Sequence, residues 1–323
     1  MKKLFGIGLA ALAMGAGLTN AAQSTPTFPS KEIRVIVPFT PGSGSDTSAR
    51  YFGERLGEML GKPVVVENKP GAGGVVALTM VKALPADGHT IVLASNSPFS
   101  VNPVVLKDLP YDPYNDFKPL AGLSKGMNVL VVKNEPGVDS LAQFVEKARN
   151  AAQPLAIGTY SAGYELATAW FADIAGFEYN NIPYKGQAAI VTDVIGGRLD
   201  AAMLNLSAAT EIINSGKLKA VAVSGADRHP AVEKVPTFKE SGFPDYELYS
   251  WTSFYVHGDT PPDITKVLSD AMTKLMSQPS SRAYLAREGS LPMPTTPEEM
   301  LAFQKSEQQH FKKIADAAGI EPK

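Results

Sequence analysis

The fold of this chain is decided by the stretch Ile33-Arg34-Val35-Ile36-Val37-Pro38-Phe39-Thr40-Pro41-Gly42-Ser43-Gly44-Ser45-Asp46. The part from Ile33 to Phe39 is rich in β-branched residues and predicts a buried strand. A loop of small residues follows, and the segment from Thr47 to Leu60 then repeats apolar residues at helical spacing, with charged residues on its other face. A strand, a glycine loop and a helix in this order predict one unit of an α/β fold.

Further along the chain, the same alternation of strands and helices continues. Short apolar runs predict strands at Val64–Val66, Ile91–Ala94, Val129–Val132, Leu155–Gly158, Ala201–Leu204 and Leu218–Val223. Helical spacing predicts helices at Leu141–Asn150, Glu165–Ala175 and Ala188–Ile195. Such alternation is typical of mostly parallel sheets covered by helices. The last third differs: it has an aromatic strand at Trp251–Val256 and helices from Pro262 to about Met276 and from Pro297 to Ala318.

Composition excludes several classes of protein. The chain has 323 residues, 44% hydrophobic and 19% charged, which suits two ordinary globular domains. The net charge of -2 gives no basic face for a nucleic acid. The sequence contains no cysteine, so disulfides, thiolate metal sites, cysteine nucleophiles and a lipid anchor on cysteine are all excluded. We expect no cofactor.

The N-terminus has the three parts of a secretory signal peptide. Lys2 and Lys3 precede an uncharged apolar run from Leu4 to Leu18, and Thr19-Asn20-Ala21 then supplies small residues for cleavage. The apolar run has about 15 residues, fewer than the roughly 20 that a membrane-spanning helix needs. The sequence therefore predicts that residues 1–21 are a cleaved signal peptide and that the mature protein is exported and soluble.

The loop from Thr40 to Asp46 supports two interpretations. Small residues and a following helix N-terminus suit an anion, which the exposed backbone N–H groups and the helix dipole favour. Alternatively, the loop is a tight turn in which Ser45 or Asp46 caps the helix. Thr47 stands where a dinucleotide-binding loop has its third glycine, and no Gly-Lys-Ser/Thr follows, so neither nucleotide motif is complete.

Comparable polar loops follow other predicted strands. They are Pro70-Gly71-Ala72-Gly73-Gly74, Ser95-Asn96-Ser97-Pro98 and Thr159-Tyr160-Ser161-Ala162-Gly163. Ligands of open α/β sheets bind beyond the carboxyl ends of the strands, where such loops meet. The unit that begins with the strand before Thr40 and the unit that begins with the strand before Tyr160 lie in different halves of the chain. This repetition indicates two lobes.

Catalytic and metal sites are not predicted. The Thr159–Gly163 loop resembles a nucleophile elbow, but Thr159 replaces its first glycine. The four histidines show no metal-binding spacing, and none stands in a context typical of a catalytic base. Asp193 and Asp200 have no carboxylate partner in the sequence. We interpret Ser161 as a hydroxyl donor to a bound solute.

Taken together, these motifs resemble the tripartite tricarboxylate transporter receptor family, of the Bug/TctC type. The resemblance is carried in order by Val37-Pro38-Phe39 with Gly42–Asp46, Glu67–Gly74, Leu84–Thr90, Pro110–Pro113 with Asp116-Phe117, Ile182–Gly186, Asp193–Gly197 with Asp200, and Val235–Phe238 with Glu240-Ser241-Gly242. It spans nearly the whole mature chain.

The resemblance implies a periplasmic-binding-protein-like α/β fold, with two lobes that each have a mostly parallel sheet and are joined by two crossing strands. It places lobe 1 at residues 28–122 and 249–323 and lobe 2 at residues 123–248. It implies a periplasmic receptor, not an enzyme, and we expect a monomer. The receptor captures a small organic acid, amino acid or related solute for membrane transporter subunits.

By the same resemblance, the ligand is held largely by backbone N–H groups of two facing loops. The implied contacts are Thr40, Gly42, Ser43, Gly44, Ser45 and Asp46 from the first loop and Thr159, Ser161, Ala162 and Gly163 from the second, with Ser95, Asn96, Tyr184, Asp193 and Asn205 in second rank. Gly163-Tyr164-Glu165-Leu166 departs from the family pattern, being shorter and lacking its histidine. Glu165 either favours an amino group on the solute or supports the helix N-terminus.

Two other functions remain open at this point. One is an exported serine hydrolase that uses Ser161. The other is a sensor that binds the same class of solute but reports to a signalling kinase.

Overall fold

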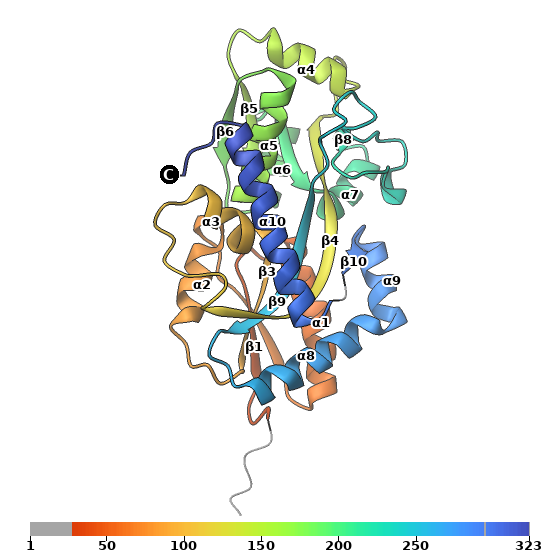
Figure 1. Cartoon of the computed structure of the whole chain (residues 1–323). Helices are drawn as coiled ribbons and strands as arrows, with labels where there is room; N and C mark the ends of the chain where they lie inside the picture. The colour runs from red at the N-terminus through yellow and green to blue at the C-terminus, as the bar shows by residue number, and fades with distance from the viewer. Residues whose placement is uncertain (1–27, 294, 323) are drawn as a thin grey trace, which may run out of the picture.

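The computed structural model describes residues 28–293 and 295–322, and its strands form two sheets that share one long strand (Figure 1). The shared strand is β4 (Phe117–Lys133). Its first part pairs with the antiparallel β9 (Tyr249–His257), and its last part pairs with strands of the second sheet. The chain therefore passes from one sheet to the other within β4 and returns ahead of β9.

The first sheet has the order β2-β1-β3-β9-β4, and a short β10 flanks β4. β1 is parallel to β2 and β3, while β9 runs against both β3 and β4. The bounds are β1 (Ile33–Val37), β2 (Val64–Asn68), β3 (Thr90–Ser95) and β10 (Leu291–Pro292).

The second sheet repeats this plan. β5 is parallel to both β6 and β7, and β4 runs against β7 and β8. The bounds are β5 (Leu155–Thr159), β6 (Tyr179–Pro183), β7 (Ala201–Asn205) and β8 (Leu218–Val223). We call each sheet, with the helices packed on it, a lobe. The two-lobed α/β fold that the sequence predicts, with mostly parallel sheets and crossing strands, is confirmed.

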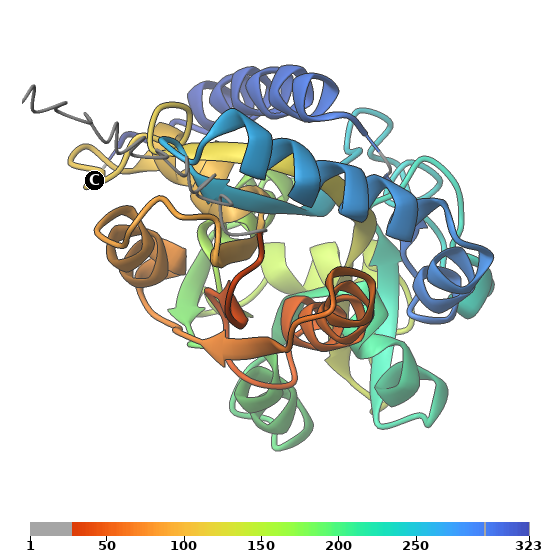
Figure 2. The ribbon, with the colours of Figure 1, turned by 90° about the horizontal axis from the view of Figure 1, so that it is seen from below.

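Helices cover both faces of the sheets because successive strand residues point to opposite sides. The helices are α1 (Gly44–Leu60), α2 (Val75–Lys82), α3 (Asn102–Val105), α4 (Leu141–Arg149), α5 (Ala162–Ala175), α6 (Gln187–Ile195), α7 (Leu206–Asn214), α8 (Pro262–Ser277), α9 (Pro279–Arg287) and α10 (Pro297–Ala317), with the short turns η1 (Ala72–Gly74), η2 (Ser97–Val101) and η3 (Pro230–Val232). Seen from below, helices lie on both sides of the strands (Figure 2).

The faces of the first sheet show this alternation directly. Val35 and Val37 pack with α1 and α8, whereas the intervening Ile36 packs with α2 and with Met300 of α10. In the second sheet, Leu130 packs towards α4 and α5, and Val131 packs towards α6. Each lobe therefore has a core on both faces of its sheet.

The last helix, α10, contacts both lobes (Figure 1). Its first part packs on β4 and η2, and Met300 is buried in the first lobe. Its last part reaches α5, where Phe311 and Ile314 join the cluster of Trp170 and Phe171. α10 thus fastens the two lobes together on one side. Within residues 28–293 and 295–322, no helix combines the length and apolar character that crossing a bilayer requires.

Candidate functional site

A polar cavity lies between the lobes, where the start of α1 faces the start of α7. We call it the α1 cavity. Hydroxyl and amide side chains from both lobes and from the crossing strands dominate its wall. Its lining residues are Phe39, Ser43, Gly44, Ser45, Ser48, Ser95, Asn96, Ser124, Gly126, Tyr160, Tyr164, Asn205, Ser207, Ser250, Trp251, Thr252, Glu288 and Ser290.

The N-terminus of α1 forms one wall of this cavity. Ser43 is the N-cap, and its hydroxyl accepts a hydrogen bond from the Asp46 amide at 3.3 Å, so the prediction that Ser45 or Asp46 caps the helix is wrong. The N-cap is Ser43 because the first helical residue is Gly44, earlier than the sequence predicted. The amides of Gly44 and Ser45 have no hydrogen-bond partner among the described residues. Both residues line the cavity, so these amides and the helix dipole favour an anion there.

Asp46 stabilises the loop from behind. Its side chain is buried and accepts hydrogen bonds from the Gly42 amide at 2.9 Å and from Arg50 at 3.2 Å. Burial alone would raise the pKa of Asp46, but hydrogen bonds from Arg50, Gly42 and Asn68, together with the charge of Arg50, outweigh it and hold the pKa below its usual value. The carboxylate is thus ionised and already paired, and it keeps the loop in shape without lining the cavity.

The opposite wall is built around Asn205, the N-cap of α7. Its side-chain oxygen accepts from the Ala208 amide at 3.4 Å and from the Ser207 hydroxyl, and its side-chain nitrogen donates to Ser250 at 3.1 Å. Ser250 lies on β9, so this network ties the second lobe to a crossing strand. Burial raises the pKa of Tyr164, which keeps its hydroxyl protonated as a donor in the same wall.

A second cavity between the lobes, which we call the α5 cavity, adjoins the first. Phe39 and Tyr160 line both cavities, and their rings meet edge to face with centroids 6.4 Å apart. The lining of the α5 cavity is Pro38, Phe39, Gly71, Ala72, Gly73, Gly74, Val75, Asn102, Leu106, Thr159, Tyr160, Ser161, Ala162, Glu165, Pro183, Tyr184 and Lys185. The aromatic pair therefore separates a hydroxyl-rich compartment from one with glycines and both signs of charge.

The structure distributes the sequence-predicted site residues over three places. The α1 cavity is lined by Ser43, Gly44, Ser45, Ser95, Asn96 and Asn205. The α5 cavity is lined by Thr159, Ser161, Ala162 and Tyr184. Neither lining includes Thr40, Gly42, Asp46, Gly163 or Asp193. The two loops thus contribute to the space between the lobes. The second-lobe wall of the α1 cavity is made by Tyr160, Tyr164 and the start of α7, and Ser161 is not part of it.

Asp193 contacts Tyr184, which lines the α5 cavity. Its carboxylate accepts a hydrogen bond from the Tyr184 hydroxyl at 2.5 Å and pairs with Arg198. The hydrogen bond from Tyr184 lowers the pKa of Asp193 below its ordinary value. This ionised carboxylate orients Tyr184 at the edge of the α5 cavity.

Several lining residues escaped the sequence reasoning. They are Ser48, Ser207, Ser250, Thr252, Glu288 and Ser290. Ser207 could have been found, because it lies two residues after Asn205 at the carboxyl end of a predicted strand. Glu288 has no local signal, since only the return of the chain after α9 brings it to this cavity.

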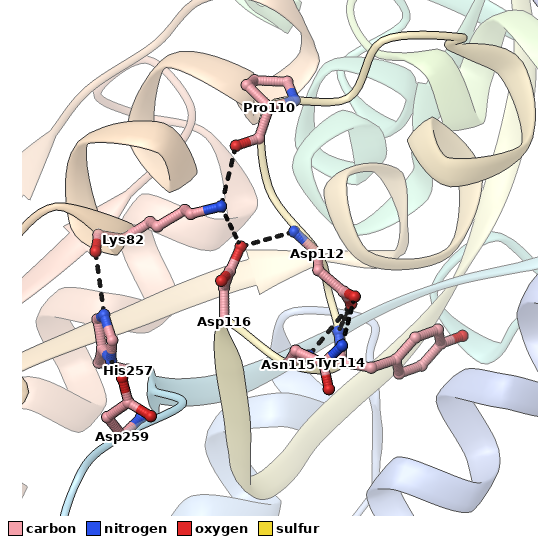
Figure 3. Close-up of polar contacts among 8 residues, drawn as sticks. All are labelled: Lys82, Pro110, Asp112, Tyr114, Asn115, Asp116, His257 and Asp259. Carbon is pink, nitrogen blue, oxygen red and sulfur yellow. Dashed lines mark hydrogen bonds and ion pairs between the residues drawn. The ribbon is translucent and has the colours of Figure 1, made fainter.

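A polar cluster away from the cavities contains the motif Pro110–Pro113 with Asp116-Phe117, one of those that carry the family resemblance. Asp112 accepts hydrogen bonds from the amides of Tyr114 and Asn115, and Asp116 pairs with Lys82 at 2.8 Å (Figure 3). Lys82 also donates to the Pro110 carbonyl. These groups satisfy one another and fix the loop before β4. Among the described residues, no group of three or more histidine and acidic side chains is arranged to hold a metal ion.

Comparison with known proteins gives a consistent result. Residues 48–320 match the model of the tripartite tricarboxylate transporter family receptor. Protein BugT of Bordetella pertussis is 32% identical over 306 residues, which cover 94% of each chain.

Solved structures agree. An R. palustris protein solved with adipate has a TM-score of 0.88 at 30% identity, covering 92% of this chain and all of the other (100%). MatC of Rhodopseudomonas palustris, solved with bound malate, has a TM-score of 0.82 at 25% identity. The match covers 89% of this chain and 99% of MatC. A structure described as a periplasmic transporter has a TM-score of 0.86 at 33% identity. The match covers 91% of this chain and 99% of the other. The chain therefore belongs to the tripartite tricarboxylate transporter receptor family.

Proposed function

We propose that this protein captures a small carboxylate solute in the α1 cavity and delivers it to the membrane subunits of a tripartite tricarboxylate-type transporter. The observation that carries the proposal is the pair of unpartnered amides of Gly44 and Ser45 at a helix N-terminus, facing a polar wall from the other lobe. The adipate and malate in related structures support a carboxylate as the ligand class.

In the proposed complex, the carboxylate accepts hydrogen bonds from Gly44 and Ser45, and the rest of the solute extends towards Asn205 and Tyr164. Ser43, Ser95 and Asn96 complete the first-lobe side. The residues at the α5 cavity, Thr159, Ser161, Ala162 and Tyr184, then line the adjoining space. The remaining predicted residues line neither cavity, and in this proposal they support the loops that do. They are Thr40, Gly42, Asp46, Gly163 and Asp193.

Ligand capture is coupled to closure of the lobes. We divide the chain into lobe 1 (residues 28–122 and 249–323) and lobe 2 (residues 123–248), which move about β4 and the segment before β9. A ligand that contacts both walls binds the closed form more tightly and so shifts the population towards it. The packing of Phe311 on the second-lobe cluster places one restraint on that motion.

The protein works in the periplasm as a monomer after its signal peptide, residues 1–21, has been removed. That segment lies outside the described residues. Family membership and the periplasmic relatives support this location. Mass spectrometry of exported protein that begins after Ala21 supports the proposal, and an intact Met1 contradicts it.

A hydrolase built on Ser161 is disfavoured by the contacts of that serine. The Ser161 hydroxyl accepts a hydrogen bond from Ser97 at 2.9 Å, and no hydrogen bond to a histidine is found for it among the described residues. General-base activation of a serine requires such a partner. Ester turnover by the purified protein that is lost in Ser161→Ala would reinstate the hydrolase. Recovery of a kinase instead of permease subunits with the ligand-loaded receptor would favour a sensor.

The test of the proposed site compares Gly44→Ala with Gly44→Leu in calorimetric titrations with small carboxylates. A methyl group at Gly44 would stand 3.8 Å from the side-chain oxygens of Asn205 and Ser207, so alanine fits. Leucine projects further into the cavity. We expect binding by wild type and Gly44→Ala and none by Gly44→Leu, with similar melting temperatures. Full binding by Gly44→Leu contradicts the site.

A further inference from the structure

We propose that Glu288 makes this protein selective for monocarboxylates whose far end is uncharged or carries an ammonium group, and that it disfavours dicarboxylates. This inference rests on the proposed function and names the ligand class for the α1 cavity. The adipate and malate of the related structures would then be poor ligands for this chain.

The charges around the α1 cavity carry the inference. Among the described lining residues, Glu288 is the one with a charged side chain, and lysine, arginine and histidine are missing from that wall. Two basic residues close in sequence to lining residues, Arg50 and Lys125, are engaged elsewhere. Arg50 pairs with Asp46 behind the loop, and Lys125 lies over the ring of Tyr249 at 4.9 Å. A ligand anion at Gly44 and Ser45 therefore meets hydrogen-bond donors but no cationic side chain among the described lining residues.

Arg287 does not cancel the charge of Glu288. Its side chain is 72% exposed, lies over the ring of Tyr284, and reaches Glu288 at only 3.8 Å. An exposed pair at this distance is weak and screened by salt. The Glu288 side chain is better covered, at 35% exposed, and it is the member of the pair that lines the cavity.

Glu288 is positioned by the first lobe, and the residue after it lies beside the second lobe. It follows α9, and its amide donates to the Tyr284 carbonyl at 3.0 Å, while the Tyr284 ring stacks on Tyr51 of α1 with centroids 3.6 Å apart. The next residue, Gly289, has φ +68°, and a side chain there would stand 3.2 Å from His229 of the second lobe. The segment therefore lies between the lobes, where Glu288 and Ser290 line the α1 cavity.

The consequence for ligands follows from the size of the solute. Gly44, Ser45 and Glu288 line one cavity, so when a carboxylate occupies the α1 amides we expect the far end of a four- or five-carbon solute to lie in that cavity. A second carboxylate there meets Glu288 with no cation to offset the repulsion, and it also loses water. An amide end meets the hydroxyl and amide wall, and an ammonium end gains an attraction to Glu288.

The experiment uses ligands of one length that differ only in the far group. Glutarate, glutaramate and 5-aminopentanoate are titrated calorimetrically into mature protein at pH 7.5, followed by succinate, succinamate and 4-aminobutanoate. We expect wild type to bind the amide and ammonium members at least about tenfold more tightly than the dicarboxylate of each set. In Glu288→Gln we expect tighter dicarboxylate binding and weaker binding of the ammonium ligands. The ratio of the affinity for the ammonium ligand to that for the dicarboxylate of the same length should therefore fall by about tenfold.

The matched control is Glu298→Gln, an exposed glutamate on α10 whose replacement should leave all ratios unchanged. Two results overturn the inference alone: dicarboxylates that bind wild type most tightly, or ratios that Glu288→Gln leaves unchanged. Failure of every member of both sets to bind wild type contradicts the proposed function itself, and the inference falls with it. Gly44→Leu should bind none of these ligands. This variant therefore tests whether they bind in the α1 cavity, whereas Glu288→Gln tests which of them the cavity prefers.

Discussion

The hydroxyl of Ser97 donates a hydrogen bond to the hydroxyl of Ser161 at 2.9 Å, across the boundary between the lobes. The same Ser97 oxygen accepts the amide of Gly163 at 3.1 Å. Ser161 is the N-cap of α5 but makes no capping bond with its own side chain. A serine of the first lobe thus satisfies the start of a second-lobe helix, and these bonds form only when the lobes lie close together.

Ser97→Ala should therefore weaken ligand binding by favouring the open form. Loss of a net hydrogen bond is worth about 1 kcal/mol, or about fivefold in Kd. Ser140→Ala is the matched control, because Ser140 caps α4 away from the cavities. It should lower the free energy of unfolding by about 1 kcal/mol and leave Kd unchanged. Calorimetry and denaturant unfolding separate the two effects, and an unaltered Kd in Ser97→Ala argues against this interlobe contact.

Gly186→Ala tests closure through a steric contact. A methyl group at Gly186 would stand 2.1 Å from the Thr40 hydroxyl and 3.2 Å from its Cβ atom. The backbone at Gly186 is extended, so alanine is not strained there, and the clash arises only from the approach of the other lobe. We expect Kd to rise by about tenfold or more as the closed form loses population.

The double variant Gly186→Ala/Thr40→Ala should recover most of that loss, because it removes the hydroxyl and methyl groups that meet the new side chain. A coupling energy near zero in this double-mutant cycle would show that the two residues do not meet in the ligand-bound form.

The sequence predicted those elements whose signals are local. β1 and β3 are runs of β-branched residues, and the helix starts at Ser140 and Thr296 carry capping residues. The first half of β4 was missed because Pro119, Gly122 and Gly126 interrupt its apolar pattern. That half is a strand because β9 supplies its hydrogen bonds, which no local pattern encodes.

The candidate site was predictable only in part, for the same reason. Ser43–Ser45 and Asn205 lie at or just after the carboxyl ends of strands. Because ligands of open α/β sheets bind beyond these ends, the sequence could locate both. Ser250 and Glu288 reach the α1 cavity through the return of the chain in its last third. The separation of Ser161 from Ser45 into different cavities depends on how Phe39 and Tyr160 pack between the lobes.

Phe311→Ala should destabilise the protein strongly, since Phe311 is fully buried where α10 meets the second lobe. Truncating a buried phenylalanine costs about 3–5 kcal/mol in free energy of unfolding. Lys312→Ala is the neighbouring control: Lys312 forms an exposed pair with Asp316, and its loss should change stability by less than about 0.5 kcal/mol. Equal unfolding free energies for the two variants would contradict the role of α10 as a fastening helix.

Glu307 should make stability depend on pH. Burial raises the pKa of Glu307 to about 7, although a hydrogen bond from Trp251 and the charge of Lys125 oppose the shift. The folded protein therefore binds the proton more tightly than the unfolded chain, and between about pH 4.5 and 7 the stabilising contribution is lost as pH rises. Glu307→Gln should raise the melting temperature relative to wild type at pH 8 and leave it nearly unchanged at pH 4.5. An equal difference at both pH values would be inconsistent with this titration.

The position of the bound carboxylate tests the central claim most directly. A crystal structure of the mature protein with its tightest monocarboxylate ligand should place the carboxylate oxygens within about 3.2 Å of the Gly44 and Ser45 amides, with the far group facing Asn205 and Glu288. A carboxylate found instead in the α5 cavity, at Ala162, would contradict the account.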